Sequence, residues 1–170
     1  MTDDTVPRYR ASIRLETVMP RSLVLLALAL LLAACGGSSS GDLRDKGGGV
    51  LEDPATSLEW AQRDNGADID FPEAQAYCTG LGTGWRLPAI KELEGLYDRD
   101  GRMSVACGTY DNQPMTCSVS PMLKLSGPTP WAADSQGTPR PFIFGLSPLR
   151  KGPGPIDGVD GARALCVRKP

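Results

Sequence analysis

Five cysteines are the residues of this 170-residue chain whose type and spacing most directly suggest chemistry. Four of them form one set: Cys78, Cys107, Cys117 and Cys166. This set contains no C-x-x-C pair, which argues against a zinc site and against a reactive thiol pair. In an exported chain an even number of cysteines indicates disulfides, and four cysteines allow three pairings. The sequence therefore predicts two disulfides, and the spacing alone leaves their pairing open.

Histidine does not occur in the chain. The commonest general base near neutral pH is therefore missing, and so is the usual partner of a nucleophilic serine or cysteine. An enzyme would have to use carboxylates or lysine. Glu92 and Glu94 fall on different faces of a predicted helix, so we expect both to be solvated rather than to act as a pair. We expect no catalytic residue and no cofactor.

Residues 63–70 form an acidic loop whose oxygen density suggests calcium. The spacing of Asp64, Asp68 and Asp70 does not match an EF-hand loop, and no glutamate closes it. We therefore expect a solvated turn that ends in a helix cap, and no metal site.

An apolar run directly before the first cysteine indicates export. Residues 22–34 are mostly leucine and alanine, and they are fewer than the ~20 that span a bilayer. This length, with small residues at its end, is typical of a signal peptide. Residues 1–21 are polar and include three acids, which is unusual before a signal core, and Met19 is an alternative start.

The segment Leu32-Ala33-Ala34-Cys35 resembles the lipobox of bacterial lipoproteins. The resemblance implies a signal peptide over residues 1–34, cleavage before Cys35, and acylation of Cys35 by chains such as palmitate, which would anchor the protein in a membrane. Gly36 follows in place of the aspartate that retains such proteins at the inner membrane, so the resemblance favours the outer membrane. The alternative is a plain secretory signal with an incidental cysteine.

Residues 35–49 are predicted to be the acylated cysteine and a flexible Gly/Ser tether, because they contain almost nothing apolar to bury. The folded domain is predicted over residues 50–170. Its first strands are expected at residues 50–51 and 58–60, joined by a turn at Pro54. Further strands are expected at residues 142–144 and 162–168.

Two helices are predicted in the middle of the domain. Asp70 and Glu73 have capping-box spacing, and Ala74, Cys78 and Leu81 then share one helix face. Glycines at positions 80, 82 and 84 end this helix. Pro88 suits the first turn of a second helix, whose apolar side is Ile90, Leu93, Leu96 and Tyr97. Trp85 lies between the helices and is expected to fill the core beneath them. The fold class is α+β.

The nine residues from Trp85 through Arg86, Leu87 and Pro88 to Leu93 (WRLPAIKEL) resemble the signature of the Lcl C-terminal domain family, a bacterial family of unknown function. Weaker flanking matches extend the resemblance over residues 49–170. It implies a loop-rich, C-type-lectin-like fold with two helices packed on short antiparallel strands. It also implies the disulfide pairing Cys78–Cys166 and Cys107–Cys117.

Two departures argue against a calcium-dependent sugar site of the lectin type. Met115 follows Gln113-Pro114 where such lectins carry an acidic ligand, and the stretch after Trp131 lacks the lectin ligands. Ligand contacts are instead expected in the loops 112–116 and 127–137. Trp131 is a candidate for an exposed aromatic contact, although burial in the core is the stronger expectation.

Composition separates the remaining classes of function. The chain is 41% hydrophobic and 22% charged, as globular proteins are, and its net charge of −2 gives no reason to expect a nucleic-acid partner. We expect a lipid-anchored envelope protein with a non-catalytic binding or structural domain whose ligand is a protein or a glycan. A cell-envelope enzyme and an assembly accessory factor are the alternatives.

Overall fold

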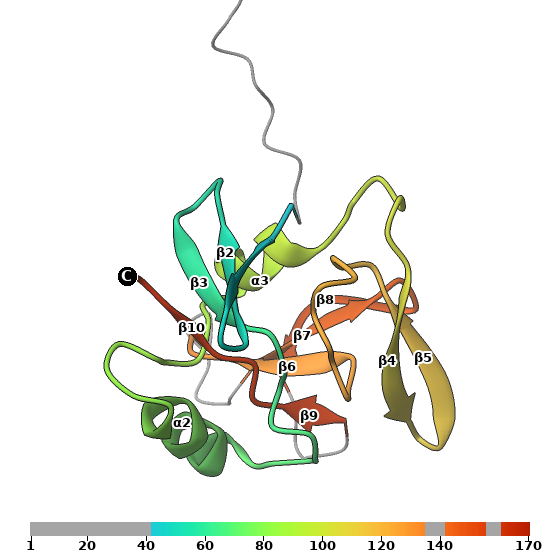
Figure 1. Cartoon of the computed structure of the whole chain (residues 1–170). Helices are drawn as coiled ribbons and strands as arrows, with labels where there is room; N and C mark the ends of the chain where they lie inside the picture. Colours follow the sequence, from blue (N-terminus) through green and yellow to red (C-terminus); the bar gives the residue numbers. More distant parts are fainter. Residues whose placement is uncertain (1–41, 135–141, 156–160) are drawn as a thin grey trace, which may run out of the picture. The chain divides into compact units, whose positions relative to one another are not determined.

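The computed structural model describes residues 42–134, 142–155 and 161–170 (Figure 1). The predicted signal peptide, Cys35 and the first part of the tether lie outside these ranges. Within these ranges, no helix has the length and apolar character needed to cross a membrane.

The described residues form a mixed α+β fold of ten strands and two helices, which confirms the predicted class at that level. In chain order the elements are β1 (Arg44–Gly47), β2 (Val50–Asp53), β3 (Leu58–Ala61), α2 (Phe71–Gly80), α3 (Ile90–Leu96), β4 (Val105–Tyr110), β5 (Gln113–Cys117), β6 (Thr129–Ala132), β7 (Phe142–Ser147), β8 (Arg150–Pro155), β9 (Ala162–Arg163) and β10 (Val167–Arg168).

The strands form three sheets. The first has the order β1-β2-β3-β10 and is antiparallel, so that it joins the beginning and the end of the domain. The second has the order β8-β7-β6-β9, in which only the β6–β9 pair is parallel. The third is the hairpin β4–β5, which lies at one side of the domain (Figure 1).

Strand β1 corrects the predicted boundary of the domain. It lies within the segment predicted to be tether, yet it pairs with β2, and Leu43 before it is buried in the core. The last residue of β1, Gly47, and the two turn residues Gly48 and Gly49 all have positive φ, which lets the chain reverse directly into β2. A Gly-rich segment thus contributes a strand because Leu43 has a buried site and because the turn requires glycine.

The predicted strand 162–168 is two strands. Ala162 at its start pairs with Thr129 in the second sheet, whereas Val167 pairs with Trp60 in the first sheet. The residues between them are buried, and Ala164, Leu165 and Cys166 are fully so. The alternating pattern that predicted one strand arises because this segment crosses the core from one sheet to the other.

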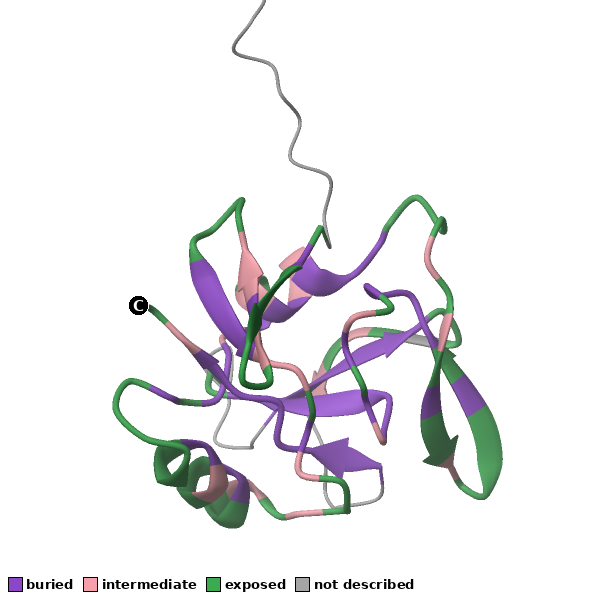
Figure 2. Cartoon of the chain, in the orientation of Figure 1, coloured by how far each residue is buried: buried purple, intermediate pink, exposed green. Residues whose placement is uncertain are grey.

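Helix α2 begins as predicted, because the Asp70 carboxylate accepts a hydrogen bond from the Glu73 backbone N–H at 2.8 Å. Ala74 and Cys78 form its buried face, but Leu81 is 44% exposed and is not part of that face. Figure 2 shows the same division along the helix, with buried residues on the side toward the sheets.

Helix α3 buries the predicted apolar residues Ile90, Leu93, Leu96 and Tyr97. Pro88 lies one residue before the N-cap, Ala89, and not in the first helical turn. The Glu92 carboxylate accepts a hydrogen bond from the Ala89 N–H at 2.7 Å, so Glu92 caps the helix rather than standing free in solvent.

Two buried clusters fill the domain. One lies around Trp60, α3 and the hairpin disulfide; the other contains Cys78, Trp85, Trp131 and Cys166. Trp85 is 7% exposed, as expected for a residue that fills the core.

Trp60 and Trp131 differ in one respect that predicts different effects of substitution. Trp60 Nε1 is buried without a hydrogen-bond partner among the described residues, whereas Trp131 Nε1 donates to the Ile69 carbonyl at 2.8 Å. An unpaired buried N–H costs about 1–3 kcal/mol, which offsets the apolar burial lost on replacement. We expect Trp60→Phe to change the unfolding free energy by less than about 1 kcal/mol, and Trp131→Phe to cost about 2 kcal/mol more. Urea denaturation of both variants measures this difference; equal costs would contradict the assignment.

Candidate functional site

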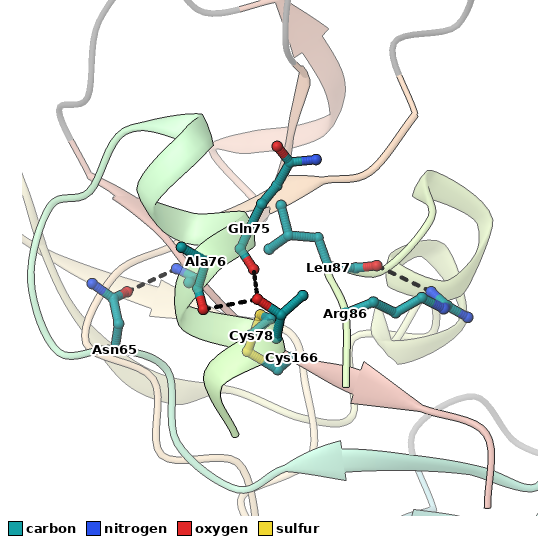
Figure 3. Close-up of a disulfide and its surroundings, with 9 residues drawn as sticks. Asn65, Gln75, Ala76, Cys78, Arg86, Leu87 and Cys166 are labelled. Carbon is teal, nitrogen blue, oxygen red and sulfur yellow. Dashed lines mark hydrogen bonds between the residues drawn. A yellow bond between two sulfur atoms is a disulfide. The ribbon is translucent and has the colours of Figure 1, made fainter. Parts of the chain in front are cut away.

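The two disulfides have the pairing that the family resemblance implied. Cys78 in α2 is bonded to Cys166, with Cα atoms 5.4 Å apart, and Cys107 is bonded to Cys117 across the hairpin, with Cα atoms 5.8 Å apart. Figure 3 shows the first bridge between helix α2 and the C-terminal segment, beside Arg86 and Leu87. No thiol of the described cysteines is therefore available as a nucleophile or metal ligand.

The motif Trp85-Arg86-Leu87-Pro88 joins α3 to the end of the chain. Arg86 exchanges two backbone hydrogen bonds of 2.9 Å with Val167, and its guanidinium makes two hydrogen bonds of 2.7 Å to Glu92. The Arg168 guanidinium lies over the Trp85 ring, 4.7 Å from its centroid. The pKa of Glu92 is lowered, first of all because Arg86 donates to the carboxylate. The motif thus serves the fold.

Glu59 is a buried carboxylate that sequence reasoning missed. It lies in β3 and is 3% exposed, with Lys46 of β1 donating to one oxygen and Arg168 of β10 donating to the other at 2.6 Å. Hydrogen bonds from Lys46 and then from Arg168 lower the pKa of Glu59 and outweigh its desolvation. The same contact raises the pKa of Lys46. Glu59 therefore ties both terminal strands to the centre of the first sheet.

This arrangement predicts acid sensitivity. Because the pKa of Glu59 is lower in the folded chain than the ordinary value of about 4.3, its contribution to stability is complete above that value. The contribution is lost as the pH falls through the lowered pKa. We expect the unfolding free energy to decrease over this acid range, with a smaller slope in Lys46→Met and the smallest slope in Glu59→Gln. Urea denaturation at stepped pH measures the slopes, and an unchanged slope in Glu59→Gln would contradict the role of this carboxylate.

The acidic loop after β3 is an internal clamp and not the solvated turn that was predicted. The buried Asp64 carboxylate accepts hydrogen bonds from the Ser126 N–H and the Ser126 hydroxyl, both at 2.7 Å, and from the Gly66 N–H at 3.0 Å. Asn65 accepts from the Ala164 N–H at 2.7 Å. The loop is ordered because its polar side chains satisfy backbone N–H groups of two distant segments.

Arg163 extends this clamp. Its Nε donates to the Ser126 hydroxyl at 2.8 Å, its Nη2 donates to the Ser126 carbonyl at 3.3 Å, and its Nη1 donates to Asp68. The pair of Ser126 and Asp64 has the residue types of a nucleophile and a base. However, Asp64 already accepts two N–H groups, and the Ser126 hydroxyl also accepts from Arg163, so these groups are fixed as a structural network.

An open groove lies beside the clamp, with a volume of about 600 Å³. One wall comes from β4, through Val105 and Ala106. The remaining lining residues come from the acidic loop and from the segment before β6: Arg63, Asp64, Gly66, Pro121, Leu123, Lys124, Leu125 and Ser126. We call this feature the β4 groove.

Two exposed cationic residues, Arg63 and Lys124, line the β4 groove. Arg63 and Lys124 face each other in a parallel β-bridge, and the Lys124 N–H donates to the Gln62 carbonyl at 2.8 Å. Like charges placed opposite each other are unfavourable. Neither side chain forms an ion pair with a carboxylate of the described residues. The charged residues that line the groove are therefore two cations and one carboxylate, Asp64, an excess of positive charge in a chain whose net charge is −2.

Two smaller hollows also lie on the surface of the described residues. One has a volume of about 280 Å³ and is polar, lined by the hairpin tip together with Asp68 and Arg163. The other has a volume of about 300 Å³ and lies against Tyr77, Leu81 and Trp85. No group of three or more His, Cys, Asp or Glu side chains in the described ranges is placed to hold a metal ion.

Trp131 lies in the core and not on the surface. It is 2% exposed, its ring packs edge-on against Phe71 at 5.6 Å, and its N–H is bonded internally. The prediction that Trp131 is an exposed ligand contact is therefore wrong, and the stronger expectation that it is buried is confirmed. Of the predicted contact loops, residues 112–114 and 116 are exposed, residues 127–132 are buried, and residues 135–137 lie outside the described ranges.

The β4 groove was missed because its parts are far apart in sequence. Arg63 and Lys124 are ordinary surface cations when read singly, and only the clamp between Asp64 and Ser126 brings them together. Comparisons of the chain with protein-family models, with curated proteins and with solved structures find no match.

Proposed function

We propose that this protein is a lipid-anchored lipoprotein of the bacterial envelope with a C-type-lectin-like domain, which binds or supports a partner without catalysing a reaction. The observation that carries the proposal is that the cysteines and the buried carboxylates of the described domain form bonds that hold the fold together. All four described cysteines are bridged, and the buried carboxylates Glu59 and Asp64 each accept hydrogen bonds from distant segments.

The lectin-like frame of this proposal is supported by the disulfides and the ends of the domain. A bridge from the first described helix to the last part of the chain, and a second bridge within a local hairpin, match the pairing that the family resemblance implies. The first sheet also brings β1 and β10 into one layer. Such a frame holds its surface loops rigidly, as a binding domain requires.

The anchor rests on the lipobox-like segment before Cys35. Metabolic labelling with a clickable fatty-acid analogue tests it in a bacterial host that processes lipoproteins. We expect label in the wild-type chain and in Cys107→Ser/Cys117→Ser, and none in Cys35→Ala. Label that persists in Cys35→Ala, or an unlabelled wild-type chain in the membrane fraction, would overturn the anchoring.

Thiol titration of the denatured protein tests the absence of catalysis by cysteine. We expect no free thiol, because Cys35 is acylated and the other four cysteines are bridged. A free thiol at Cys78 or Cys166 would favour an envelope enzyme. Capture of the protein within an envelope complex, with no ligand for the isolated protein, would favour an assembly factor.

A further inference from the structure

We propose that the β4 groove binds an extended acidic peptide of a partner protein, which adds as a strand to the free edge of β4 and places its carboxylates on Arg63 and Lys124. This inference rests on the proposed binding function and gives it a partner class. Four features of the groove carry it.

The first feature is an open strand edge. Strand β4 is bonded to β5 along one edge only, and β5 has no other partner strand. No backbone hydrogen bond joins Val105 or Ala106 to a segment outside the hairpin among the described residues. Val105 and Ala106 line the groove and Gly108 lies against Ser126, so the β4 side of the hairpin faces the groove.

The second feature is the way the groove is closed at one end. At Gly108 the β4 backbone approaches the other wall so closely that a Cβ atom there would lie 1.8 Å from the Ser126 carbonyl oxygen. Toward Val105 and Ala106 the two walls separate and enclose the volume of about 600 Å³. The groove therefore begins beside a fixed contact and passes Val105 and Ala106 of β4, which suits a short segment in extended conformation.

The third feature is the fixed position of the two cations. The Arg63–Lys124 bridge is next to Asp64, whose carboxylate holds Ser126 through two bonds of 2.7 Å. The clamp and the bridge hold the backbones of the two residues side by side, and the Lys124 ammonium donates to the carbonyl of Pro121, another lining residue, at 2.9 Å. A carboxylate that reaches both side chains would offset the repulsion between like charges. Asp64 forms no ion pair with either cation, because its oxygens accept from Ser126 and Gly66, and a single carboxylate leaves an excess of positive charge beside two cations.

The fourth feature is the mixed character of the lining. Val105, Ala106 and Pro121 contribute apolar surface between the strand edge and the cations. A small anion such as phosphate would use only the cations. A strand whose side chains alternate between carboxylates and apolar groups would use the cations, the apolar surface and the backbone edge together. The chemistry of the groove thus favours an acidic peptide.

The test uses the full-length acylated protein in detergent micelles and a synthetic peptide, acetyl-Thr-Glu-Val-Glu-Thr-Glu-amide. Isothermal titration calorimetry measures its dissociation constant. We expect binding that weakens about three-fold in Arg63→Gln and in Lys124→Gln, and about ten-fold in the double variant. The matched control is Lys91→Gln/Arg99→Gln, which removes two exposed cations outside the groove and should leave the constant unchanged.

Two further probes separate strand addition from simple charge attraction. The same peptide N-methylated at every residue keeps its carboxylates but cannot donate to β4, and we expect it to bind at least about ten-fold more weakly. Dextran sulfate should not displace the peptide at equal charge concentration. Equal binding of the methylated peptide, displacement by dextran sulfate, or equal losses in the control variant would each overturn the proposal.

The outcomes also separate this inference from the proposed function. Peptide binding with an unmodified Cys35 would remove the anchoring and leave the β4 groove assignment in place. A lipidated, fully bridged protein that does not bind the peptide would keep the proposed function and overturn the acidic-peptide assignment.

Discussion

Loss of the Cys78–Cys166 disulfide in the variant Cys78→Ser/Cys166→Ser is expected to lower the unfolding free energy by about 4.6 kcal/mol. The bridge closes a segment with a sequence separation of 88, and the stabilisation from restricting the unfolded chain grows with the length of the closed loop. Both cysteines are fully buried in one cluster with Trp85 and Trp131, so the bridge also fixes α2 to that cluster. Urea denaturation of the purified variant measures the loss.

The hairpin disulfide supplies the matched control. Cys107→Ser/Cys117→Ser makes the same chemical change at a sequence separation of 10, for which the same relation gives about 2.7 kcal/mol. The long bridge should therefore cost about 2 kcal/mol more than the short one. A larger loss in the hairpin variant would contradict the view that the Cys78–Cys166 bridge is the main staple of the domain.

Gly108→Ala is expected to lower the unfolding free energy by about 2–5 kcal/mol. Two costs add at this position: a positive φ costs an L-residue about 1–2 kcal/mol, and forced overpacking costs about 1–3 kcal/mol. Gly108 has φ +77°, and the added Cβ would lie 1.8 Å from the Ser126 carbonyl oxygen, which is backbone and cannot rotate away. The hairpin must then move from the Ser126 segment, so the β4 groove should also lose its shape.

Gly101→Ala separates the two costs. Gly101 has φ +68°, but a Cβ atom there would meet nothing within 4 Å. This variant should therefore lose only the conformational part, about 1–2 kcal/mol. Chemical denaturation of both variants gives the difference. Equal losses would mean that the hairpin does not rest on Ser126 in solution.

The parts of the fold that the sequence predicted are those encoded by neighbouring residues. The α2 cap follows from Asp70 and its spacing to Glu73, and the apolar side of α3 follows from the helical period of Ile90, Leu93 and Leu96. In each case the residues that decide the structure lie within two helical turns of each other, so pattern and contact coincide.

The parts that the sequence did not predict depend on contacts between distant residues. The sequence of β1 is indistinguishable from that of a Gly-rich tether. The difference lies in the hydrogen bond from Lys46 to Glu59 and in the burial of Leu43 in the core. Likewise, the acidic loop has the sequence of a solvated turn, and it is ordered because Asp64 accepts hydrogen bonds from Ser126, 62 residues away. Burial of a charged residue is decided by its partner, and local spacing does not reveal a partner so remote.

The candidate site divides in the same way. The disulfide pairing came from the family resemblance, since spacing left three pairings open. Neither the residue spacing nor the family resemblance predicted the β4 groove, because Arg63 and Lys124 become neighbours only through the parallel bridge that the clamp supports. The predicted contact loop 127–137 was wrong over residues 129–132, which form the buried strand β6, whereas the stronger expectation that Trp131 is buried is confirmed.

Non-reducing peptide mapping by mass spectrometry, on protein purified from membranes, tests the central claim most directly. We expect an acylated N-terminal peptide that begins at Cys35, together with cross-linked peptides that contain Cys78–Cys166 and Cys107–Cys117. A free thiol in any of these peptides, a different pairing, or an unmodified Cys35 would contradict a lipid-anchored domain whose cysteines serve only its frame.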